Sequence, residues 1–269
     1  MPLARPDLES LLRARRLDCT LTTAWPPDAA VAPPGDPGDT GDAGDPGNND
    51  AAVAPTGITP LDARLGGGFP RGQLSELVGP RSSGRTSVLL RLLAAATGRG
   101  ELVALVDALD MLDVESAHAA GVVLDRLLWV RGHVVANPGL CRDLNRRAIE
   151  QAVRAFAMVL QAGNFGVVVF DVAEAPADAI RGLPFTTWLR LQRLMEGSQT
   201  AGVLVGTQSM ARSRSGLTLK FQVPASRSPV RCRGRLFDGL DVEAQVVRAR
   251  SHAYQETAAA FATIAAYGA

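Results

Sequence analysis

Residues 74–86 read LSELVGPRSSGRT, an apolar run that leads directly into a glycine-rich loop. The loop follows the pattern G-x-x-x-x-G-K-[ST], in which backbone N–H groups cradle phosphates. In that pattern the lysine reaches the β- and γ-oxygens and the hydroxyl ligates Mg²⁺. Gly79, Gly84 and Thr86 match it, whereas Arg85 occupies the lysine position. The stretch predicts a strand followed by a phosphate-binding loop, with one chemical departure.

A helix is expected directly after the loop, over residues 86–97, so that its N-terminus points at the phosphates. Arg85 has two interpretations, because Lys220 is the only lysine of the chain and arginine drift would explain the exchange. An arginine is nevertheless forked and bulkier than a lysine, so phosphate contact would change in geometry. The predicted nucleotide-binding residues of the loop are Gly79, Ser82, Ser83, Gly84, Arg85 and Thr86.

Short apolar runs alternate with longer helical stretches beyond residue 56, a pattern that predicts a largely parallel twisted sheet flanked by helices. Asp143 is the expected N-cap of the longest helix. The expected strands are 74–78, 101–107, one within 124–130, 165–171 and 202–208, and the expected later helices are about 143–161 and 186–195.

The C-terminal part shows a period of two instead. LTLKFQV, RLFDGLD and VEAQVVRAR alternate in polarity around a turn expected at Asp238–Gly239. This pattern predicts antiparallel strands at one edge of the sheet. An alanine-rich helix is expected to close the chain from about Tyr254 to Tyr267.

Three regions separate by composition. Residues 1–25 contain a helical segment with Leu8, Leu11 and Leu12 on one face, which would cover its own domain or a neighbouring subunit. Residues 26–55 are rich in proline, glycine, aspartate and alanine, and are expected to form a disordered linker. Residues 56–269 are expected to form the α/β core with its C-terminal strands and helix.

Bulk composition argues against a metal-binding, secreted or membrane-spanning protein. The 269 residues are 46% apolar, and the net charge of +1 does not by itself indicate a nucleic-acid partner. The three cysteines and three histidines are scattered without the spacing of a metal site. We expect a cytoplasmic protein, because no secretory h-region or long apolar span is present.

A second candidate metal ligand follows the apolar run FGVVVFD at 165–171. Asp171 ends this expected strand, where a carboxylate would lie beside the phosphate loop and assist Mg²⁺ binding together with Thr86. Aspartate also commonly ends strands, so the pairing with the loop is what favours the functional interpretation.

The stretch from Thr56 to Thr86, TGITPLDARLGGGFPRGQLSELVGPRSSGRT, resembles the start of the core of the RecA-type recombinase family. The resemblance extends over roughly residues 56–223. It implies ATP and Mg²⁺ as cofactors, Asp171 in the second metal motif and Gln208 as the nucleotide-sensing glutamine. Further segments that carry it are 102–107, 112–113, 120–121 and 124–128.

Departures from that family concern catalysis and DNA binding. The resemblance places the water-activating glutamate two residues after Asp107, where this chain has Leu109. Asp110 is adjacent but is a doubtful substitute as a general base. The segments that resemble the two DNA-binding loops are short, and in the second one Arg212 and Arg214 are candidate phosphate contacts or simply exposed residues. A basic run has the same two interpretations and contains Arg227, Arg231, Arg233 and Arg235.

Within the family the chain resembles the shortened RecA-like proteins of SOS mutagenesis, the ImuA type. This resemblance implies an accessory role in damage tolerance, with RecA and a translesion polymerase-like protein as partners and weak or absent ATPase activity. The alternative is a DNA-dependent ATPase or recombinase that binds ATP and single-stranded DNA and self-associates. A damage-induced inhibitor of cell division is a weaker third hypothesis, because the frame of the phosphate loop is intact.

Overall fold

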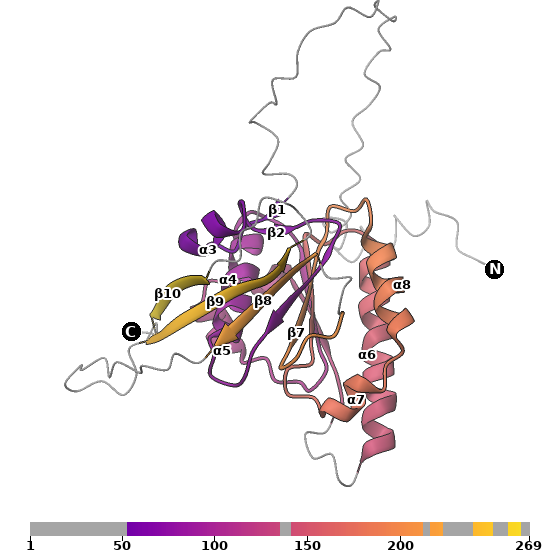
Figure 1. Ribbon diagram of the computed structural model, residues 1–269. Helices are drawn as coiled ribbons and strands as arrows, with labels where there is room; N and C mark the ends of the chain where they lie inside the picture. Colours follow the sequence, from indigo (N-terminus) through magenta and orange to yellow (C-terminus); the bar gives the residue numbers. More distant parts are fainter. Residues whose placement is uncertain (1–52, 135–140, 212–215, 223–238, 250–257, 265–269) are drawn as a thin grey trace, which may run out of the picture. The chain divides into compact units, whose positions relative to one another are not determined.

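The computed structural model describes residues 53–134, 141–211, 216–222, 239–249 and 258–264 (Figure 1). The predicted N-terminal helical segment lies outside these ranges, and so does the predicted linker up to residue 52. The linker prediction extends slightly too far, because its last residues include strand β1 (Val53–Ala54), which pairs antiparallel with β2 (Phe69–Pro70).

An eight-stranded sheet forms the centre of the fold, in the order β10-β9-β8-β3-β7-β6-β4-β5. The six strands from β8 to β5 run parallel, whereas β9 is antiparallel to both β8 and β10. This confirms the predicted largely parallel sheet with antiparallel strands near the C-terminus. The strands are β3 (Leu74–Val78), β4 (Val103–Asp107), β5 (Leu127–Arg131), β6 (Val167–Asp171), β7 (Ala201–Gly206), β8 (Leu217–Gln222), β9 (Gly239–Ala249) and β10 (Ala258–Ile264).

Helices cover the two faces of the parallel part of the sheet. Helices α4 and α5 lie on one face, and α6, α7 and α8 lie on the other (Figure 1). The longest helix begins after Cys141 rather than after the predicted Asp143, which lies in its first turn without capping it. The helices are α3 (Thr59–Arg64), α4 (Arg85–Gly98), α5 (Val114–Ala119), α6 (Arg142–Ala162), α7 (Ala177–Arg181) and α8 (Phe185–Met195).

The central parallel strands β4, β6 and β7 are almost entirely apolar because both of their faces are buried. In β6, Val167 and Val169 join the hydrophobic cluster under α4, while Val168 and Phe170 join the cluster under α6 and α8. This division follows from the period of two in a strand, where successive side chains point to opposite faces. The apolar runs of the sequence therefore located these strands correctly.

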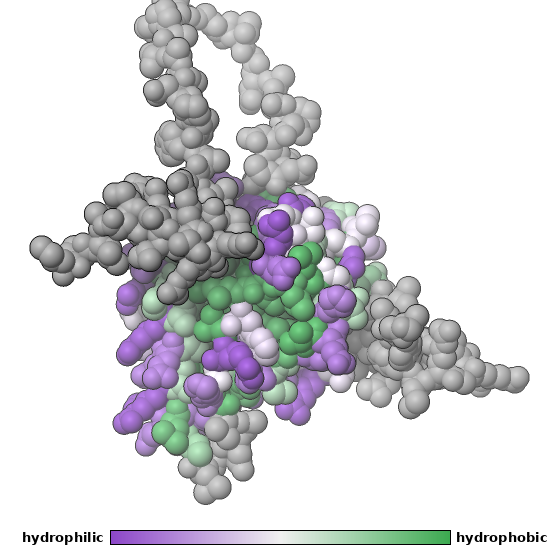
Figure 2. Space-filling model, turned by 180° about the vertical axis from the view of Figure 1, so that it is seen from behind, coloured by the Kyte–Doolittle hydropathy of each residue, from purple (hydrophilic) through white to green (hydrophobic). Residues whose placement is uncertain are grey.

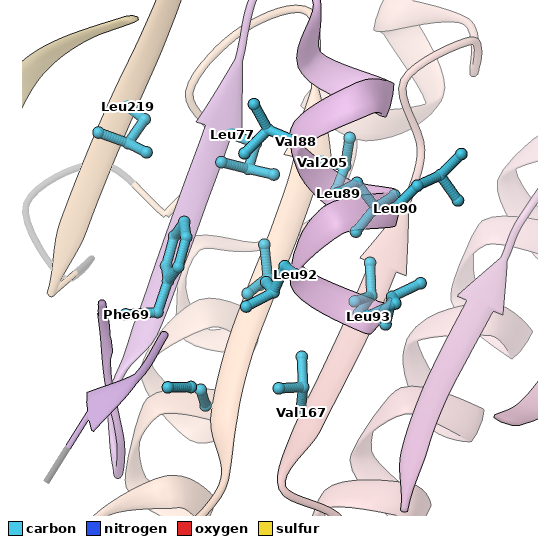
Figure 3. Close-up of a cluster of buried hydrophobic side chains, with 14 of the residues drawn as sticks. Phe69, Leu77, Val88, Leu89, Leu90, Leu92, Leu93, Val167, Val205 and Leu219 are labelled. Atoms are coloured by element: carbon cyan, nitrogen blue, oxygen red, sulfur yellow. The ribbon is translucent and has the colours of Figure 1, made fainter. Parts of the chain in front are cut away.

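Helix α4 fixes the position of the phosphate loop by packing on the strands beside it. Val88 lies beside Leu77 of β3, while Leu92 and Leu93 lie over the neighbouring strands of the same cluster, which includes Val205 of β7 (Figure 3). All five side chains are at most 1% exposed, and each contributes about 1.5–3 kcal/mol relative to an exposed position. The start of the helix is thus held where β3 ends.

The alanine-rich C-terminal helix is a wrong prediction over the part that the structure describes. Residues 258–264 form β10, which pairs with β9 from Ala258 opposite Gln245 to Ile264 opposite Gly239. Alanine favours helix by intrinsic propensity, but pairing with an open strand edge overrides it here. Gly239 likewise begins β9 rather than forming the predicted turn, while Asp238 lies outside the described residues.

Several large apolar side chains remain exposed, and Figure 2 shows hydrophobic side chains gathered on the face turned away from the viewer of Figure 1. No described helix combines the length and apolar character that crossing a bilayer requires. Four of the exposed apolar residues lie between the end of β4 and the middle of β5, namely Met111, Val114, Val123 and Leu128.

Candidate phosphate-binding site

The predicted phosphate loop connects β3 to α4, as the sequence indicated. Its backbone turns through left-handed conformations at Ser82 (φ 57°) and Gly84 (φ 85°), and Gly84 is the N-cap of α4. Within the described part of the chain, the N–H groups of residues 81–86 have no backbone acceptor. Free N–H groups at a helix N-terminus attract anions, so the loop has the geometry of a phosphate site.

Arg85 is turned into the protein and is only 5% exposed. Its Nη1 donates to the carbonyl of Gly79, which follows β3, and to the carbonyl of Gly206, which ends β7, at 2.9 Å. Burial lowers the pKa of Arg85, and the nearby carboxylates of Asp171 and Glu174 oppose that shift. In this arrangement the guanidinium ties two strand ends together instead of being presented to solvent.

Glu174 contacts both arginines of the loop. Its Oε2 accepts a hydrogen bond of 2.5 Å from Nε of Arg81, and its Oε1 lies 3.7 Å from Nη2 of Arg85. Arg81 is largely exposed, whereas Glu174 is 21% exposed. The sequence analysis missed Glu174, because a single glutamate past the end of a strand carries no pattern of its own.

Asp171 lies at the end of β6, separated from β3 by β7 alone. Burial raises its pKa from 3.8 to about 6, and the charge of Asp107, its neighbour in β4, adds to the shift. A 2.9 Å hydrogen bond from the Ala173 N–H and the charge of Arg85 act in the opposite direction. A carboxylate held at such a cost beside a phosphate loop is typical of a functional position.

The residues present fit a magnesium ion only in part. Thr86 is exposed at the start of α4, and Asp171 reaches the same edge of the sheet. The described residues contain no group of three or more side chains able to hold a metal. Magnesium commonly uses one or two protein oxygens together with substrate phosphates, so these two residues would hold it only beside a bound nucleotide.

Replacing Asp171 with asparagine is expected to raise the free energy of unfolding by about 3 kcal/mol at pH 7. The folded state binds the Asp171 proton more tightly than the unfolded state, so wild-type stability falls as the pH rises from about 4 to about 6. The variant lacks this loss, so the difference in free energy of unfolding between variant and wild type should vanish near pH 4. Urea unfolding at a series of pH values measures it. Asp178→Asn is the control, because a hydrogen bond from Arg181 lowers the pKa of Asp178.

No free general base stands at the water-activating position that the resemblance implied. Leu109 packs against the cluster under α6 and α8, and its N–H donates to Asp107 at 3.3 Å. Asp110 forms two hydrogen bonds of 2.6 Å with Arg131, and these lower the pKa of Asp110. Asp107 also accepts from the Trp129 indole N–H at 3.3 Å. The carboxylates nearest this position are therefore already engaged within the protein.

Gln208 is exposed just beyond β7 and lines a cavity with residues that follow β6, among them Val172 and Trp188. No hydrogen bond joins Gln208 to another described residue, and its predicted nucleotide-sensing role stays a prediction. Arg212 and Arg214, the predicted DNA contacts, lie outside the described residues, as does the predicted basic run of residues 227–235.

Glu76 is a second residue that the sequence analysis missed. It lies in the middle of β3 with no exposed surface. Its carboxylate accepts from the backbone N–H groups of Met210 and Ala211, at 2.6 and 2.7 Å, and from the hydroxyls of Ser209 and Thr218, at 2.5 and 3.2 Å. A charged residue within the apolar run LSELV was the available signal, because a buried charge requires such partners.

Comparison with known proteins agrees with this geometry. The family described as the RecA N-terminal domain matches residues 40–195. The chain is 38% identical over 168 residues to the protein RecA of Salinispora tropica, which covers 60% of this chain and 44% of that protein. For the protein RecA of Symbiobacterium thermophilum the identity is 38%, with coverages of 60% and 43%. For that of Mycobacterium leprae it is 37%, with coverages of 63% and 22%.

The aligned part thus spans less than half the length of these relatives. The family match, residues 40–195, contains the phosphate loop, the strand that ends at Asp171 and the helices α4 to α8. Because the family match takes in more than half of the sequence, the chain belongs to the RecA N-terminal domain family.

Proposed function

We propose that this RecA-like chain is an accessory protein of the DNA damage response and of translesion mutagenesis, which acts mainly through protein partners and hydrolyses ATP weakly or not at all. The observation that carries the proposal is Leu109, a half-buried apolar side chain that packs against the hydrophobic cluster where the family resemblance calls for a glutamate. Without a base, an attacking water is not activated. ATP and Mg²⁺ binding at the loop and Asp171 remains part of the proposal.

Partner binding is supported by the edge of the sheet at β5. Among the described strands, β5 pairs only with β4, so its other edge presents backbone donors and acceptors. Leu128 exposes apolar surface on this strand, and Val123 exposes more shortly before it. An open edge flanked by apolar side chains suits an added strand from another protein. RecA and a translesion polymerase-like protein are the partners that we propose.

The test is a turnover assay on the full chain with ATP and Mg²⁺, with and without single-stranded DNA. We expect turnover at least roughly 100-fold below that of the Salinispora tropica RecA measured beside it, since a general base contributes about 10²–10⁴-fold. Robust turnover stimulated by DNA would instead favour the alternative, a DNA-dependent ATPase or recombinase. A pull-down with purified RecA and polymerase-like protein tests the partners separately, and binding to neither would remove the adaptor role.

A further inference from the structure

Glu174 acts as an internal anion at the phosphate loop. We propose that its carboxylate competes with the phosphates of a nucleotide for Arg81 and Arg85, and so sets the affinity of the site. The inference rests on the proposal that this loop binds nucleotide.

Glu174 lies against both arginines of the phosphate loop. The carboxylate of Glu174 receives the side chain of Arg81 at 2.5 Å and lies 3.7 Å from the side chain of Arg85. These two arginines flank residues 82–84, whose N–H groups have no backbone acceptor in the described structure. A carboxylate that contacts the cationic side chains on both sides of these N–H groups occupies the electrostatic position that a phosphate would take.

The environment of Arg85 shows that the present contacts do not exhaust this site. Within the described residues, Nε of Arg85 and Oγ of Ser83 are buried without a hydrogen-bond partner. Ser83 is 1% and Arg85 5% exposed. Buried donors without partners cost free energy, so the present contacts leave this side of the loop incompletely satisfied. Glu174 satisfies part of the positive charge and leaves these donors unused.

Arg85, which stands where the loop pattern has a lysine, determines the geometry of this contact. A guanidinium carries several donors in a fixed plane, so Arg85 donates to Gly79 and Gly206 through one nitrogen and faces Glu174 with another. A lysine ammonium is a single point charge on a flexible stem and has no such fork. Arg85 and Glu174 therefore act together. The two carbonyls hold the guanidinium in place, and the carboxylate of Glu174 lies near its positive charge.

The experiment titrates the full-length wild type and the variants Glu174→Ala and Glu174→Gln with inorganic tripolyphosphate and with ATP and Mg²⁺ by calorimetry. Removing the carboxylate is expected to tighten binding of both ligands about tenfold or more, the equivalent of about 1.4 kcal/mol. Asp178→Ala is the matched control. It removes a carboxylate of the same segment that pairs with Arg181, and its affinity should equal that of the wild type.

Equal affinities for the wild type and both Glu174 variants would overturn the inference, and so would weaker binding by the variants. Thermal unfolding of each variant establishes that it is folded, which the partial exposure of Glu174 favours. Turnover in the same samples decides the proposed function independently. Tighter binding without hydrolysis supports both proposals. Tighter binding with rapid hydrolysis supports the role of Glu174 and contradicts the role assigned to Leu109.

Discussion

Replacing Glu76 with alanine is expected to lower the free energy of unfolding by about 3–5 kcal/mol. The substitution removes the one carboxylate that accepts the N–H groups of Met210 and Ala211 and the hydroxyl of Ser209, and leaves these groups without an acceptor. Glu76→Gln should cost less, because an amide keeps one acceptor oxygen. Chemical denaturation measures the stability of each variant.

The control for this experiment is Glu243→Ala, which removes an exposed glutamate of β9. We expect its stability to stay within about 0.5 kcal/mol of the wild type. Hydrogen exchange at residues 209–211 should rise in the Glu76 variants and stay unchanged in the Glu243 variant. A Glu76→Ala protein as stable as the control would show that the buried carboxylate holds nothing in place.

Glu76 also connects two regions that the family resemblance assigns to different tasks. It lies on the strand that leads into the phosphate loop, and its partners directly follow Gln208. The start of the segment that resembles the second DNA-binding loop is therefore fixed to the strand that carries the phosphate loop. A displacement of either would have to break hydrogen bonds to a buried charge, so we expect the two to move together.

The sequence predicted those elements whose side chains follow a simple period. The apolar runs that became β3, β4, β6 and β7 were recognisable because each strand is buried on both faces. β10 was missed because its alanines carry helix propensity, while its strand character comes from pairing with β9. Local patterns reveal burial, but they do not reveal which distant segment will supply a hydrogen-bonding edge.

The residues of the candidate site likewise divide into those with a local sequence pattern and those whose partners are distant in the sequence. The loop and Asp171 were found from spacing, since a strand, a glycine loop and a helix stand in sequence order. Glu174 and Glu76 act through residues that are 93 and about 135 positions away, so no local pattern could identify their partners. The orientation of Arg85 was also beyond the sequence, because it depends on the carbonyl of Gly206 in a different strand.

Gly84 raises the question of what has preserved the shape of the phosphate loop. Its φ of 85° favours glycine, and a Cβ built there would lie 2.3 Å from a side-chain carbon of Val242. Val242 belongs to β9, which packs against the loop from the antiparallel edge of the sheet. Close packing of β9 therefore demands a glycine at this position whether or not nucleotide binds, so the loop pattern alone is a weak argument for hydrolysis.

Gly84→Ala is accordingly expected to lower the free energy of unfolding by about 3–4 kcal/mol, the sum of a left-handed backbone conformation and an overpacked contact. Gly98→Ala is the matched control at the other end of α4, where no atom lies within 4 Å of the added carbon. It should stabilise the protein by about 0.5–1 kcal/mol. Both are measured by denaturant unfolding without nucleotide. A Gly84→Ala protein as stable as wild type would mean that β9 does not constrain the loop, and retention of the glycine would then point to phosphate binding itself.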